Sequence, residues 1–121
     1  MRRIVIGCAA LLVCAAGCGS GSDNSPSSTC DSVANALNSL SGKYSACGQL
    51  PAIPFDKNAC VQGFNASSCS DADRQKINDF TSCLTGIPSC TPQTQSTWSD
   101  SLVACDNKLQ GISQSCAAAA P

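Results

Sequence analysis

The chain has 121 residues, and its seven Lys and Arg against eight Asp give a net charge of −1, with no Glu and no His. This balance excludes the basic surface that nucleic-acid binding requires, and the missing His removes the usual general base of hydrolases and a common zinc ligand. Three Phe, one Tyr and one Trp are the only aromatic residues available for a core. A domain with so few bulky side chains needs covalent support.

The first 17 residues have the pattern of a secretory signal. Arg2 and Arg3 precede an uncharged, mainly aliphatic run over residues 4–16. The run is shorter than the roughly 20 residues that a membrane-spanning helix needs. We therefore predict that residues 1–17 are a signal peptide and that the rest of the chain is exported.

The sequence Ala-Ala-Gly-Cys at positions 15–18 resembles the lipobox of bacterial lipoproteins. This resemblance implies cleavage before Cys18 and a lipid on its sulfur, so that acyl chains hold the mature protein on a membrane. Ser20 stands where an Asp would resemble an inner-membrane retention signal, which favours the outer membrane or the cell surface. Residues 18–29 form a polar, flexible tether in this interpretation. The alternative is ordinary secretion without an anchor.

Eight of the eleven cysteines follow the predicted anchor and its signal. An even set in an exported chain indicates a disulfide framework and an oxidising compartment. These eight residues are Cys30, Cys47, Cys60, Cys69, Cys83, Cys90, Cys105 and Cys116.

Apolar residues at steps of three or four predict a first helix from Cys30 to Cys47. Thr29 or Ser28 can cap its start, and Gly48 can end it. The residues of its apolar face between the two cysteines are Val33, Leu37, Leu40 and Tyr44.

A loop and a short second helix follow. Pro51 and Pro54 forbid a regular helix over residues 49–55. Asp56 can cap a helix that runs toward Phe64.

The third helix has the clearest start. Ser70 stands at the cap position, and Asp71 and Asp73 favour the positive helix end. Gly86 and then Pro88 end it. Its apolar face contains Ile77, Phe80 and Leu84.

The fourth helix is predicted to run from Thr91, with Pro92 in its first turn, to Cys116. Trp98 lies on its apolar face with Leu102, Leu109 and Ile112, so we expect it in the core. No alternating run predicts a strand. The expected fold is thus all-α, a disulfide-stapled bundle of about four helices over residues 30–116, with a tail at 117–121.

Eight cysteines allow 105 pairings, which the sequence alone does not decide, but helix geometry ranks them. When two helices form an antiparallel hairpin, the two residue numbers of each facing pair add up to nearly the same value. The pairs Cys83–Cys90 and Cys69–Cys105 meet this condition, so both can bridge the third and fourth helices. A third bridge would close the Pro51–Pro54 loop, and the fourth joins the two remaining cysteines. At the register of this fourth bridge Leu37 faces Leu109 and Val33 lies beside Ile112, so the apolar faces of the first and fourth helices agree with it. The predicted pairs are Cys83–Cys90, Cys69–Cys105, Cys47–Cys60 and Cys30–Cys116.

Catalytic patterns are missing. The mature chain has no Cys-x-x-Cys pair, no Gly-x-Ser-x-Gly elbow and no haem motif. Asp71 and Asp73 are interpreted as helix-start acids and not as a calcium loop. We predict no enzyme, no cofactor and no metal site.

The sequence therefore predicts a binding or structural module at the cell envelope, with a protein partner that it does not name. Three alternatives make different structural predictions. An interaction module or secreted inhibitor needs an exposed apolar patch. A carrier of a lipid or small apolar ligand needs an apolar cavity between the helices. An enzyme needs a cleft with a perturbed ionisable group.

Overall fold

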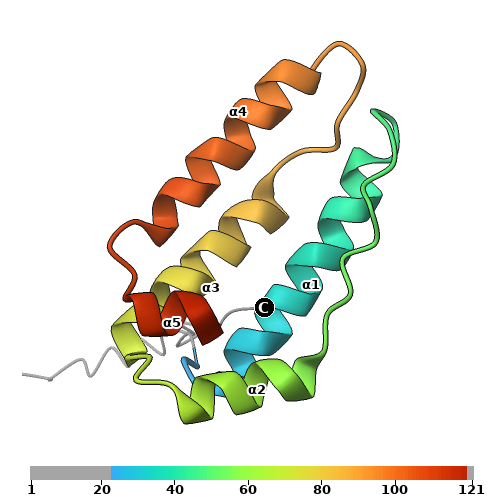
Figure 1. The fold of residues 1–121 in the computed structure, drawn as a ribbon. Coiled ribbons are helices and arrows are strands. Elements are labelled where there is room, and N and C mark those ends of the chain that lie inside the picture. Colours follow the sequence, from blue (N-terminus) through green and yellow to red (C-terminus); the bar gives the residue numbers. More distant parts are fainter. Residues whose placement is uncertain (1–22, 120–121) are drawn as a thin grey trace, which may run out of the picture.

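A computed structural model describes residues 23–119, and all regular structure in this part of the chain is helical (Figure 1). The all-α prediction is therefore confirmed. The predicted signal peptide and Cys18 lie outside the described residues. The helices are α1 (Pro26–Tyr44), α2 (Lys57–Ala66), α3 (Asp71–Gly86), α4 (Gln95–Asp106), the short 3-10 helix η1 (Asn107–Leu109) and α5 (Gln114–Ala119).

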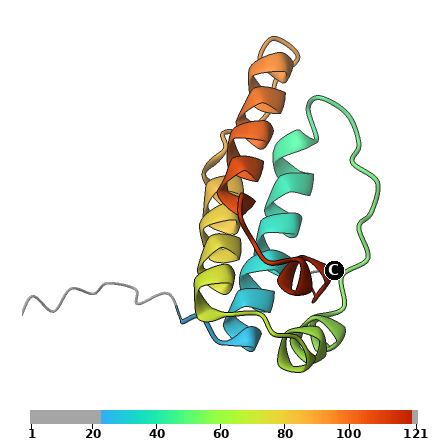
Figure 2. The same ribbon diagram turned by 60° about the vertical axis from the view of Figure 1, so that its left-hand side comes forward.

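Three long helices lie side by side, with α3 between α1 and α4 (Figure 1). Helices α2 and α5 lie together at one end of this layer, which we call the base (Figure 2). The link from α1 to α2, residues 45–56, runs back along α1 to reach the base. The layer has no fourth long helix within residues 23–119.

Side-chain caps define three helix starts. Asp56 accepts hydrogen bonds from the backbone N–H groups of Asn58 and Ala59, at 2.8 and 3.1 Å, and Ser70 accepts one from Asp73 at 3.1 Å. Both caps confirm the sequence prediction. Helix α1 begins earlier than expected, because Ser25 caps it and Pro26 occupies the first turn, where the missing N–H has no helical partner.

The predicted fourth helix is wrong at its start and in its length. A turn in which the Thr91 N–H donates to the Thr94 hydroxyl precedes α4, so the helix begins at Gln95. It ends at Asp106, and the chain turns at Gly111, whose φ of 72° lies in the left-handed region that glycine tolerates. The segment that follows forms the separate helix α5 at the base.

Buried apolar residues form two clusters. The basal cluster consists of Cys30, Cys60, Phe64, Cys69, Ile77 and Cys116. The apical cluster, at the opposite end of the layer, consists of Ala36, Leu84, Ile87, Cys90, Trp98 and Cys105.

Trp98 anchors the apical cluster, as its place on the predicted apolar face indicated. Its side chain is 4% exposed, its indole N–H donates to the Pro88 carbonyl at 3.0 Å, and its ring centroid lies 5.0 Å from that of Tyr44. The polar end of the indole is therefore satisfied inside the core.

All eight cysteines from Cys30 onward form disulfides, but the predicted pairing is wrong at every bridge. The predicted pairs Cys30–Cys116, Cys47–Cys60, Cys69–Cys105 and Cys83–Cys90 do not form. The bridges are Cys30–Cys60, Cys47–Cys90, Cys69–Cys116 and Cys83–Cys105.

The link between α3 and α4 explains the shift in the hairpin bridges. Residues 87–94 are not a tight turn; Ile87 is buried, and the Cys90 N–H donates to the Lys43 carbonyl at 2.7 Å. The link thus docks on the end of α1 and brings Cys90 to Cys47. As a result, the residues of α3 and α4 that face each other differ from the predicted ones, and Cys83 pairs with Cys105.

The base explains the other two bridges. Helix α2 packs against α1 and α5, which places Cys60 of α2 beside Cys30 of α1. The C-terminal segment leaves the predicted fourth helix and places Cys116 beside Cys69 at the start of α3.

Candidate functional site

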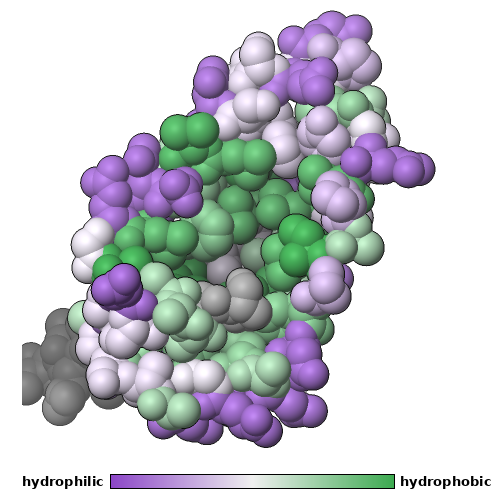
Figure 3. All heavy atoms as spheres, in the orientation of Figure 1, coloured by the Kyte–Doolittle hydropathy of each residue, from purple (hydrophilic) through white to green (hydrophobic). Residues whose placement is uncertain are grey.

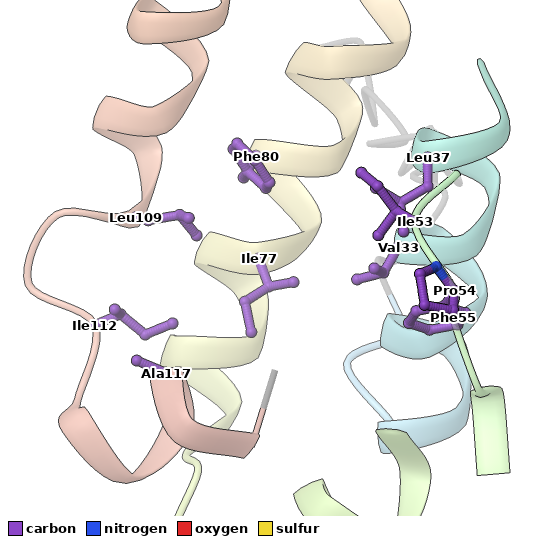
Figure 4. Close-up of a pocket in the computed structure, with 10 residues that line it drawn as sticks. All are labelled: Val33, Leu37, Ile53, Pro54, Phe55, Ile77, Phe80, Leu109, Ile112 and Ala117. Carbon is purple, nitrogen blue, oxygen red and sulfur yellow. The ribbon is translucent and has the colours of Figure 1, made fainter. Parts of the chain in front are cut away.

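An apolar cavity of about 350 Å³ opens on the face of the layer that Figure 1 presents (Figures 3 and 4). Hydrophobic residues gather on the middle part of this face, and hydrophilic residues lie along much of its outer edge (Figure 3). The volume lies within the roughly 300–1,000 Å³ of small-molecule pockets. The lining residues are Val33, Leu37, Ile53, Pro54, Phe55, Ile77, Phe80, Leu109, Ile112 and Ala117.

Helices α1 and α3 supply two walls of the cavity. Val33 and Leu37 are four positions apart on α1, and Ile77 and Phe80 are three apart on α3, so each pair lies on one helix face. Ile77 is 3% exposed and belongs to the basal cluster. The cavity is therefore continuous with the core of the base.

The link between α1 and α2 covers one side of the cavity. Its residues 53–55 project toward the space opposite α3 (Figure 4). Pro54 keeps this stretch non-helical, and Asp56 then starts α2. Ile53 lines the cavity although it is 60% exposed, so one face of the link remains in contact with solvent.

The remaining wall comes from the broken C-terminal segment. Leu109, Ile112 and Ala117 reach the cavity from η1, from the turn after Gly111 and from α5, respectively (Figure 4). A continuous helix could not place all three here, because the turn at Gly111 redirects the chain toward the base. The disulfide Cys69–Cys116 holds α5 in this position.

Asp73 and Ser113 form a second tie to the C-terminal segment. The Ser113 hydroxyl donates to the Asp73 carboxylate at 2.8 Å, and its N–H donates at 3.3 Å. The hydroxyl contact above all lowers the pKa of Asp73; burial opposes this shift, while the Ser113 N–H and contacts with Ser70 reinforce it. Asp73 is therefore both a helix-start acid, as predicted, and an anchor for the segment before α5.

Two sulfurs and a carboxylate meet at this tie. The sulfurs of Cys69 and Cys116 and a carboxylate oxygen of Asp73 lie within 4.8 Å of one another. The two sulfurs are bonded to each other, and a disulfide does not supply the thiolate that a metal needs. The arrangement as it stands is a covalent and hydrogen-bonded staple.

Most of these side chains were predicted to lie on apolar helix faces, but the cavity was not predicted. Val33 and Leu37 lie across from Leu109 and Ile112, as the sequence indicates, but the two faces were expected to touch. In the structure the two faces lie on opposite sides of the cavity (Figure 4). The covering stretch 53–55 was read only as a loop, although its apolar Ile-Pro-Phe sequence was a signal that the loop packs on something.

Comparison with models of protein families, with curated proteins and with solved structures finds no match. None of the helices over residues 23–119 combines the length and the apolar character that crossing a membrane would require. Four disulfides in so small a unit fit a stabilised module of the extracellular or exported type.

Proposed function

We propose that this protein is a non-enzymatic binding module of the cell envelope, held to a membrane by a lipid on Cys18, whose cavity takes a small apolar ligand. The observation that carries the proposal is the cavity itself. The ten described residues that line it are all apolar, so the cavity favours a ligand without charge.

The cavity supports one of the alternatives that the sequence left open more than the others. A flat interaction surface would need an exposed patch and no hollow, whereas a carrier needs apolar space between its helices. The cavity between α1, α3 and the C-terminal segment provides such apolar space. Ligand carriage is therefore the best-supported role for this face.

Catalysis has little support from the lining. No lining residue offers a nucleophile, a general base or a ligand for a metal. The shifted pKa of Asp73 arises from its contact with Ser113 outside the lining, where it stabilises the fold. We infer a ligand that is bound and released unchanged.

Photolabelling tests the binding proposal. The full protein, purified from membranes and reconstituted in vesicles, is irradiated with an uncharged alkane that carries a diazirine, and the labelled peptides are mapped by mass spectrometry. We expect labelling around Ile53, Leu109 and Ala117. Labelling spread evenly over exposed residues would contradict the proposal.

Two neighbouring alanines of α5 supply matched variants. Ala117 lines the cavity and Ala118 does not, and both are exposed, so Phe is tolerated at either position. Ala117→Phe fills part of the cavity and should lower labelling about tenfold, whereas Ala118→Phe should leave it unchanged. Equal labelling in the two variants would place the probe elsewhere.

The anchor has its own test. We expect the intact mass of protein from the membrane fraction to correspond to a chain that starts at Cys18 and carries acyl groups. Eight thiols should become alkylatable only after reduction. Cys18→Ser should lose the added mass, and an unlipidated wild-type protein would contradict the anchor while leaving the cavity unaffected.

A further inference from the structure

A second apolar hollow, of about 370 Å³, adjoins the cavity. The two share Leu37 of α1 and Phe80 of α3. Among residues 23–119, Asp106 is the only charged residue that lines either hollow. The other residues of the second hollow are Leu40, Leu84, Leu102 and Val103.

Together the two hollows form one trough along the helix layer. On α1 the apolar wall runs from Val33 through Leu37 to Leu40. Its length along the helix axis is about 10 Å. Because α1 and α3 pack side by side, the wall of α3 from Ile77 to Leu84 runs along it over the same length.

The two ends of the trough differ. Near the base, residues 53–55 cover one side of the trough, and α5, which the disulfide Cys69–Cys116 holds in place, covers another (Figure 4). The apical end is open, and Val103 there is 63% exposed. A ligand therefore has one protected end and one end in contact with water.

This shape selects among apolar ligands. A helix of a partner protein, about 10 Å across, could not enter the covered basal end without displacing residues 53–55. A compact ring system could fill the cavity but would leave the trough from Leu84 to Val103 empty. A long, narrow and flexible chain fills both hollows.

Building on the proposed ligand-binding function, we propose that the occupant is the unbranched alkyl chain of a single-chain amphiphile, such as a fatty acid. Its methyl end lies in the cavity beside Ile77 and Ala117, and its polar end emerges at the apical opening past Leu102 and Val103. The charged residue Asp106 stays outside the covered basal end, which keeps the methyl end in a wholly apolar environment.

Position-resolved photolabelling tests the orientation. Two fatty acids of equal length are used with the full protein in vesicles, one with a diazirine near the methyl end and one with a diazirine near the carboxyl end. We expect the first to label residues around Ile77 and Ala117 and the second to label residues around Leu102 and Val103.

Neighbouring residues of α4 again supply matched variants. Val103→Asp places a charge on the exposed wall of the apical hollow and should lower labelling by the carboxyl-end probe about tenfold. Ala104 is exposed and does not line either hollow, so Ala104→Asp should leave both probes unaffected.

The outcomes separate this inference from the function on which it rests. Labelling of the basal cavity by both probes would show a ligand that does not extend along the trough, which overturns the inference and leaves the proposed function intact. Labelling of neither hollow would overturn both. Labelling that is absent in native membranes and returns after purification would assign the trough to a protein partner and overturn the inference.

Discussion

The two clusters of buried residues solve the problem of a small core in different ways. Four of the six buried members of the basal cluster are cysteines, against two of six in the apical cluster. The apical cluster has Trp98, which packs on the ring of Tyr44 and has its N–H satisfied. The basal cluster has Phe64 as its one buried aromatic side chain.

This difference explains why the cavity lies where it does. Trp98 packs inside the apical cluster, and the hollow that adjoins this cluster is more open than the basal cavity. The disulfides Cys30–Cys60 and Cys69–Cys116 hold the base together without supplying bulky side chains. A covalent bridge limits the unfolded chain and does not require close packing on every side. The base can therefore keep an apolar space open that a core held by packing alone would close.

Removal of the apical anchor should have the largest effect on stability. Trp98→Ala deletes a buried aromatic side chain, and we expect the free energy of unfolding to fall by about 3–5 kcal/mol. Urea unfolding followed by far-ultraviolet circular dichroism measures it. Val103→Ala, at an exposed position, should change stability by no more than about 0.5 kcal/mol. Equal effects would mean that packing of Trp98 does not hold the apical end.

Removal of a single bridge should have the next largest effect and should differ between the two ends. Replacement of both members of Cys30–Cys60 by Ala should cost about 2–5 kcal/mol. The same change at Cys83–Cys105 should cost less, because that bridge closes a loop of 22 residues instead of 30 and Cys83 is only partly buried. Urea unfolding of both double variants checks the order, and a larger loss at Cys83–Cys105 would contradict the greater dependence of the base on its bridges.

The smallest effect concerns the tie at Asp73 and depends on pH. The contact with Ser113 lowers the pKa of Asp73 in the folded protein, so ionised Asp73 contributes stability above its ordinary pKa of about 3.9. That contribution is lost as the pH falls through the lower folded value. We expect Asp73→Asn to be less stable than the wild type at pH 7 and to approach it in acid.

Unfolding measured against pH for both proteins tests this expectation. Asp100→Asn, at an exposed position of α4, shows the effect of removing one surface charge. A constant difference between Asp73→Asn and the wild type from pH 7 into acid would show that ionisation of Asp73 does not stabilise the base.

Local patterns in the sequence predicted most of the helices. The spacing of apolar residues and the caps at Asp56 and Ser70 identified α2 and α3, because these signals act within a few residues of chain. The even number of cysteines indicated disulfides, and the place of Trp98 on its helix face indicated burial. Each of these depends on short-range geometry.

The pairing of the cysteines and the cavity were decided by tertiary structure. Cys90 meets Cys47 because the α3–α4 link docks on α1. Cys116 meets Cys69 because the chain turns at Gly111. Helical periodicity specifies neither the docked link nor the turn. The apolar faces that the sequence places opposite one another carry no information on the distance between them. By itself the sequence determined which side chains of each helix turn inward. The links and disulfides determined the distance between the helices, because only long-range contacts set the spacing of packed helices.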